Sequence, residues 1–106
     1  MNALDLIQTD RIVDLIEQMV AIESVSGNEH AMADWVTAFL NQLNPDELHR
    51  LPVEESGDSV AAVFNKDGTG PAMLLNFHLD TFPEFAGWQT PAFQVQRQGD
   101  LSLIHI

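Results

Sequence analysis

The sequence predicts an α/β domain in which two helices precede several short strands. Apolar residues recur at three- and four-residue spacing in two stretches of the first half of the chain, which indicates amphipathic helices. Beyond residue 46, short apolar or alternating runs are separated by turn-forming residues, which indicates strands. With 106 residues, 45% of them hydrophobic, the chain can form one modest domain or a part of a larger one.

The periodic stretches define the two helices. The first is predicted over residues 9–21, with Thr9 or Asp10 as its N-terminal cap. The second opens at an apparent capping box, in which the Ser26 hydroxyl caps the helix and Glu29 stands at the third helical position. An Asn-Pro-Asp sequence ends this helix.

Four later runs predict strands. Residues 47–54 suit an edge strand, because Pro52 cannot donate a hydrogen bond in the middle of a sheet. Residues 60–64 form a compact apolar run. Residues 72–77 are apolar at nearly every position, which is typical of a strand covered on both faces, whereas residues 93–97 alternate and predict a strand with one wet face.

Composition excludes several classes of function. Sixteen acidic residues against four basic ones leave a formal net charge of −12, so nucleic acid and anionic membranes are not expected partners. The absence of cysteine excludes a thiolate zinc site and a cysteine nucleophile. No apolar stretch reaches the ~20 residues of a membrane helix, and no basic signal peptide is visible. We expect a cytoplasmic protein.

The end of the chain has an unusual sequence. Residues 101–106 read Leu-Ser-Leu-Ile-His-Ile, the translation of a transposon mosaic end used in preparing sequencing libraries. We therefore expect residues 1–100 to be the genuine, truncated reading frame and residues 101–106 to be a non-native tail. An independent clone of the gene tests this expectation, and a native stop codon directly after Ile106 would contradict it.

The segment after the run 72–77 carries the candidate chemistry. His78 and Asp80 are two positions apart, so on an extended segment their side chains share a face. Ligands of α/β sheets bind beyond the carboxyl ends of strands. A neutral imidazole binds zinc well, and a nearby carboxylate can hold its other ring N–H. The alternative interpretation of this triplet is a surface histidine beside a turn-forming aspartate.

Three segments, residues 23–29, 78–83 and 88–93, resemble in order the N-terminal signatures of a zinc-dependent amidohydrolase family. That family includes acetylornithine deacetylase, succinyl-diaminopimelate desuccinylase, aminoacylase and glutamate carboxypeptidase. The resemblance spans about residues 9–100. It implies that residues 1–100 are the N-terminal part of a zinc-peptidase-like, three-layer catalytic domain with a mixed sheet.

The resemblance also implies roles for single residues. His78 matches the first metal ligand, and Asp80 matches the catalytic-site carboxylate that orients it. The family's site holds two metal ions, expected here to be zinc with cobalt or manganese possible, and its other ligands and its general base would lie downstream. Phe82 replaces the usual valine, Phe77 replaces a small residue, and Pro91 stands one position early.

These roles imply a metal-dependent hydrolase that cleaves the amide bond of an N-acyl amino acid or a peptide, with a lid domain outside this chain forming a homodimer. The chain alone is expected to be inactive, because one imidazole cannot supply about four metal donors. The alternative is a non-catalytic α/β binding module or an inactive relative. The resembling family completes its site with an aspartate that bridges the two metals and a pair of glutamates. Finding these residues downstream would favour the enzyme.

Other candidate residues have simpler interpretations. His30 and His49 are expected to be solvated, and Trp88 is a loop aromatic that could line the pocket. Ser24 and Ser26 have no adjacent base, and Ser26 is interpreted as a helix cap. A sheet cut in mid-domain leaves an unpaired edge, so we expect the chain to self-associate when expressed alone.

Overall fold

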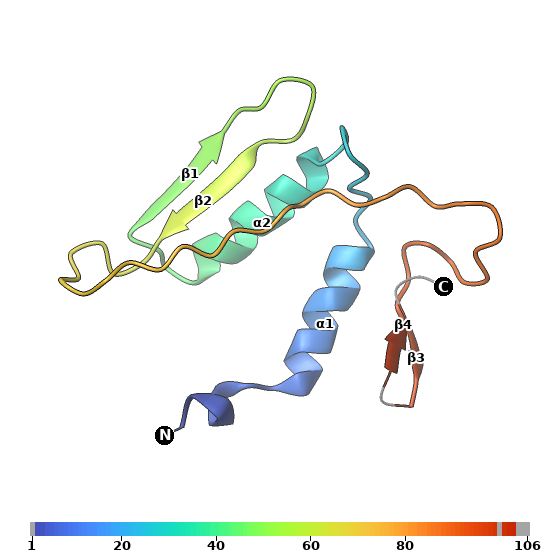
Figure 1. The fold of residues 1–106 in the computed structure, drawn as a ribbon, viewed down its shortest axis with the longest axis horizontal. Helices are drawn as coiled ribbons and strands as arrows, with labels where there is room; N and C mark the ends of the chain where they lie inside the picture. Colours follow the sequence, from blue (N-terminus) through green and yellow to red (C-terminus); the bar gives the residue numbers. More distant parts are fainter. Residues whose placement is uncertain (1, 100, 104–106) are drawn as a thin grey trace. The chain divides into compact units, whose positions relative to one another are not determined.

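Helix α2 (His30–Gln42) packs on a hairpin of two strands, β1 (Glu47–Leu51) and β2 (Ser59–Val63), in the computed structural model (Figure 1). The structure describes residues 2–99 and 101–103. It contains two compact units. One unit is Glu23–Phe82, which holds α2 and the hairpin. The other combines the segments that precede and follow Glu23–Phe82 in the sequence.

The hairpin pairs its strands antiparallel, with Glu47 opposite Val63 and Leu51 opposite Ser59. Strand β1 ends directly before Pro52, which has no N–H for the ladder, so the predicted edge strand is confirmed over its first five residues. The run predicted at 60–64 forms β2 with a shift of one residue.

The core of this unit is small and lies under α2. Met32 and Ala33 are the buried apolar residues of the helix, and Trp35 stacks on Phe39 with ring centroids 5.4 Å apart. Leu43, which the periodicity places on the same apolar stripe, is exposed because the helix has ended at Gln42. The predicted second helix is therefore confirmed, but it is shorter than its hydrophobic pattern.

Arg50 ties the helix to the hairpin. Its guanidinium forms ion pairs of 2.9 Å with Asp34 on α2 and with Asp58 in the loop before β2, and it also donates to the Thr37 hydroxyl at 3.1 Å. These carboxylates and the hydroxyl satisfy a planar group with several N–H donors. The half-buried guanidinium of Arg50 therefore joins the helix to the hairpin. Its isolated position in the sequence does not reveal this role.

The predicted capping box is wrong. Helix α2 begins at His30, and neither Ser26 nor Glu29 caps it with its side chain. The buried Glu29 carboxylate instead accepts hydrogen bonds from the Gly27 N–H at 2.9 Å, the Ser56 hydroxyl at 2.8 Å and the Gly57 N–H at 3.2 Å. These donors, the Gly27 amide above all, lower the pKa of Glu29 to about 2.

The apolar run at 72–77 differs from its prediction. No strand is present in this segment, and the side chains of Met73, Leu74, Leu75 and Phe77 are mostly exposed. A strand that is apolar on both faces needs neighbours on both sides, and the described part of the chain offers it none. The three-layer domain with a mixed sheet therefore stays a prediction. The described strands pair antiparallel, and an isolated parallel bridge joins Val25 to Thr81.

The flanking segments contain a 3-10 helix (Ala3–Leu6), helix α1 (Thr9–Val20), and strands β3 (Gln96–Gln98) and β4 (Leu101–Leu103). Helix α1 confirms the first predicted helix, but the predicted cap at Thr9 or Asp10 is wrong. Gln8 occupies the cap position without a side-chain hydrogen bond. None of the helices among the described residues has the length and apolar character to cross a bilayer.

Strand β3 pairs antiparallel with β4, and Gly99 adopts a φ of 60° at the turn between them. The alternating run predicted at 93–97 forms a strand only from Gln96 onward. Strand β4 lies within the expected non-native tail. Because alternating apolar residues form strands whatever their origin, that expectation stays a prediction. The end of the tail, including His105, lies outside the described residues.

Candidate metal site around His78 and Asp80

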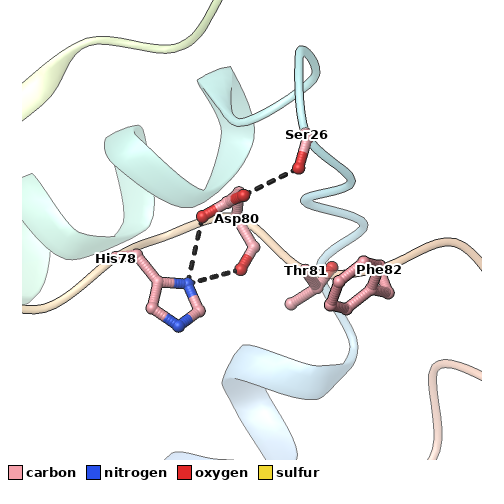
Figure 2. Close-up of a pocket in the computed structure, with 5 residues that line it drawn as sticks. All are labelled: Ser26, His78, Asp80, Thr81 and Phe82. Carbon is pink, nitrogen blue, oxygen red and sulfur yellow. Dashed lines mark hydrogen bonds and ion pairs between the residues drawn. The ribbon is translucent and has the colours of Figure 1, made fainter.

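Two segments far apart in the sequence meet at the candidate site within the unit Glu23–Phe82. Val25 and Thr81 form a parallel bridge, in which the Thr81 N–H donates to the Ser24 carbonyl at 2.9 Å and the Ser26 N–H donates to the Thr81 carbonyl at 3.3 Å. The hydroxyls of Ser24 and Thr81 also lie 3.4 Å apart. This bridge holds the serine-rich segment beside the segment that carries His78 and Asp80 (Figure 2).

A tight turn follows the bridge. The Asn28 N–H donates to the Val25 carbonyl at 2.7 Å, and Gly27 lies between them with a φ of 93°. Side chains other than glycine are strained at this positive φ. The glycine thus permits the chain to reverse directly after Ser26, which leaves the Ser26 side chain facing Asp80.

The imidazole of His78 is oriented by Asp80. Its Nδ1 lies 3.0 Å from Oδ1 of the Asp80 carboxylate and 2.8 Å from the Asp80 main-chain oxygen. Both partners can only accept hydrogen bonds, so Nδ1 must carry the proton and Nε2 of the neutral ring keeps its lone pair. The side chain of His78 is 85% exposed, so Nε2 is accessible to an ion from solvent.

The Asp80 carboxylate is engaged at both oxygens. Oδ2 accepts a hydrogen bond of 2.7 Å from the Ser26 hydroxyl, and Oδ1 faces His78, as the dashed lines in Figure 2 show. The Ser26 bond, with a smaller contribution from His78, lowers the pKa of Asp80 against the opposing effect of partial desolvation. Asp80 is therefore ionised at neutral pH and acts as an acceptor for both neighbours.

A shallow pocket opens at this edge of the unit. Its lining combines polar groups with the ring of Phe82, which stands where the resembling family has valine; the residues are Ser26, His78, Asp80, Thr81 and Phe82. Among the described residues, no group of three or more histidine, cysteine, aspartate or glutamate side chains could hold a metal ion. This edge thus combines an exposed imidazole, that of His78, with the carboxylate that orients it.

The remaining sequence candidates lie elsewhere. His30 is exposed, and His49 contacts Glu47 at 2.9 Å on the hairpin. Trp88 belongs to the flanking segments and does not line the described pocket. Sequence reasoning missed the role of Ser26, which it interpreted as a helix cap. The signal that could have found it is that Ser26 belongs to one of the three segments that carry the family resemblance.

Two known proteins, both named as probable carboxypeptidases, are similar in sequence to this chain. A probable carboxypeptidase of Emericella nidulans is 34% identical over an alignment of 82 residues, which covers 76% of this chain and 19% of that protein. A probable carboxypeptidase of Neosartorya fischeri is 29% identical over an alignment of 93 residues, which covers 76% of this chain and 21% of that protein. The chain is similar to carboxypeptidases. It spans about one fifth of the length of these curated relatives.

No protein-family profile matches the chain, and no solved structure matches it. The similarity to the two fungal proteins supports a relationship to peptidases in general.

Proposed function

We propose that this chain is the N-terminal part of a metal-dependent hydrolase that cleaves an amide bond in a peptide or an N-acyl amino acid. The observation that carries the proposal is the geometry of His78, whose Nδ1 lies 2.8 and 3.0 Å from two acceptor oxygens of Asp80 while its side chain is 85% exposed. The two relatives named as probable carboxypeptidases support hydrolysis of a peptide bond as the reaction.

In this proposal His78 binds a divalent cation through Nε2, and Asp80 fixes the ring and raises its basicity. The donor type fits zinc, and it also accepts cobalt or manganese. The chemistry that a bound pair of such ions would supply is polarisation of the scissile carbonyl and activation of a water molecule. The remaining ligands and the general base would come from residues outside this chain, because a single imidazole does not complete a site. The chain alone is therefore proposed to be inactive.

Phe82 gives the proposed substrate pocket an apolar wall beside the metal-binding edge. A substrate that places an apolar side chain or acyl group there would fit this wall. Peptides and N-acyl amino acids both offer such groups, so a substrate panel must separate them. Dimerisation through a lid domain outside this chain and a cytoplasmic location remain predictions.

A second candidate is a non-catalytic binding module or an inactive relative. The observation that favours it is the short contact between His78 Nδ1 and the Asp80 main-chain oxygen, 2.8 Å, which also stabilises the local backbone conformation without any metal. In that case the imidazole would shape the segment 78–82 and bind no ion.

The test uses the full-length protein that contains this chain. Metal content and hydrolysis of a panel of peptides and N-acyl amino acids are measured before and after chelation. We expect His78→Ala to remove bound metal and activity, and Asp80→Asn to lower metal affinity or activity about 10- to 100-fold. His30→Gln, which changes an exposed imidazole on α2, is the matched control and should leave both unchanged. Full metal content and activity in His78→Ala would contradict the proposal and favour the binding module.

A further inference from the structure

We propose that Ser26 is a positioning residue of this site, because its hydroxyl holds the Asp80 carboxylate in the orientation that keeps the other carboxylate oxygen on His78 Nδ1–H. The inference rests on the proposed function and adds to it a residue whose hydroxyl donates to Asp80. The three side chains form one hydrogen-bonded series, Ser26 to Asp80 to His78 (Figure 2).

The geometry shows why Asp80 needs a second partner. The Ser26 hydroxyl is 2.7 Å from Oδ2, and His78 Nδ1 is 3.0 Å from Oδ1, so the two donors hold opposite oxygens of one carboxylate. The terminal torsion of an aspartate is soft and has broad minima. The Asp80 side chain is also 43% exposed, so water competes for its oxygens. A donor fixed by the protein restricts this rotation, which the imidazole alone does not do.

Ser26 can act as a fixed donor because its own backbone is held. Its N–H donates to the carbonyl of Thr81, the residue that follows Asp80, and Ser26 is itself a central residue of the turn that the Asn28 N–H closes on the Val25 carbonyl. The side-chain bond between Ser26 and Asp80 joins positions 54 apart in the sequence, and the Val25–Thr81 bridge brings them together. The donor is thus tethered to the segment that it orients.

The same geometry argues against Ser26 as a nucleophile. A serine nucleophile needs a general base on its hydroxyl, usually an imidazole. Here the protonated Nδ1 of His78 faces Asp80 and not the serine, and the serine proton is directed at the carboxylate. The arrangement therefore supports orientation of Asp80 and not transfer of an acyl group to Ser26.

The chain offers a matched control for Ser26. Ser56 also donates its hydroxyl to a carboxylate, that of Glu29, at 2.8 Å in the same unit. Ser56→Ala removes a hydrogen bond of the same kind and of similar length, and this bond does not involve His78 or Asp80. Any effect that both alanine variants share is a general loss of packing or stability, whereas an effect confined to Ser26→Ala reports on the candidate site.

The experiment compares Ser26→Ala, Ser26→Thr and Ser56→Ala in the full-length protein. Zinc affinity is measured by competition with a chelator, and the His78 tautomer is measured by ¹⁵N NMR of the metal-free, histidine-labelled protein at one fixed pH. We expect Ser26→Ala to weaken zinc binding about 10-fold, the lower end of the range for groups that orient a ligand, and to reduce the Nδ1–H tautomer of His78. Ser26→Thr, which keeps the hydroxyl, should restore both, and Ser56→Ala should change neither.

Wild-type zinc affinity and an unchanged tautomer in Ser26→Ala would overturn the inference, and so would an equal effect of Ser56→Ala. If zinc binding depends on His78 and Asp80 but not on Ser26, only this inference fails. If His78→Ala binds zinc as the wild type does, the proposed function fails. The tautomer measurement needs no metal, so it still decides whether Ser26 positions Asp80 and, through it, the imidazole.

Discussion

Single residues in this chain make hydrogen bonds that their local sequence does not suggest. Ser26 and Glu29 have the spacing of a capping box, yet each side chain reaches a different distant segment. Glu29 is the more buried of the two, and three donors surround its carboxylate. Burial of a charge is tolerated only when such donors replace water. Glu29 therefore couples the folding of its unit to pH.

The pH dependence of stability follows from the pKa of Glu29, which folding lowers from 4.5 to about 2. A carboxyl whose folded pKa is depressed stabilises the folded state above the unfolded pKa, and this contribution is lost as pH falls through the folded value. We expect the stability of the chain to decline between about pH 4.5 and pH 2 by an amount that Glu29→Gln abolishes. Urea unfolding of both proteins across this range measures the difference. Identical pH slopes for the two proteins would contradict the assignment.

Between elements, the loop before β2 closely approaches the residue that precedes α2 in the unit Glu23–Phe82. A Cβ at Gly57 would lie 2.6 Å from the Glu29 carbonyl carbon, a contact that real structures do not contain. The loop can therefore donate its Gly57 N–H to Glu29 only because position 57 has no side chain. The hairpin and the helix are joined at this point and, farther along, by Arg50.

Gly57→Ala should destabilise this unit, because the backbone of the loop must move away from Glu29 to make room. We expect a loss of about 1–3 kcal/mol, the usual cost of forcing atoms into a packed site. Gly70→Ala is the control, since a Cβ at Gly70 meets nothing within 4 Å. Denaturant unfolding measures both variants. Equal stability of the two would show that the contact at Gly57 relaxes without cost.

On the scale of the whole molecule, the chain combines a formal net charge of −12 with an exposed, mostly apolar segment, residues 72–77. Met73 and Leu74 are 82% and 89% exposed as residues, and Phe77 and Phe82 are exposed as well. Apolar segments that are extended and unpaired act as templates for association. The net charge opposes association through electrostatic repulsion between chains. Salt screens this repulsion, so it opposes association only weakly at physiological ionic strength.

Self-association of the chain should therefore depend on this segment. We expect Leu74→Lys to raise the monomer fraction at physiological ionic strength, measured by light scattering after size exclusion. Gln18→Lys adds the same charge at an exposed polar position on α1 and should change the monomer fraction much less. If both substitutions act alike, net charge and not the apolar segment controls association.

Local pattern was sufficient for part of this fold and part of the site. The helices and the hairpin strands follow from periodicity and from Pro52, because contacts within three or four residues or along one strand dictate them. The contact between His78 and Asp80 is equally local, since two residues of one extended segment share a face.

Tertiary structure decided the rest. The Ser26 hydroxyl bonds to Asp80 only because two segments 54 residues apart meet in the fold. The Glu29 carboxylate bonds to the Gly57 N–H only because the loop before β2 folds back to it. The apolar run at 72–77 reads as a buried strand, yet burial depends on neighbouring strands and not on composition. Hydrogen-bond partners and burial are properties of what the fold brings together, so the sequence determined which groups are available and the folded chain determined which of them meet.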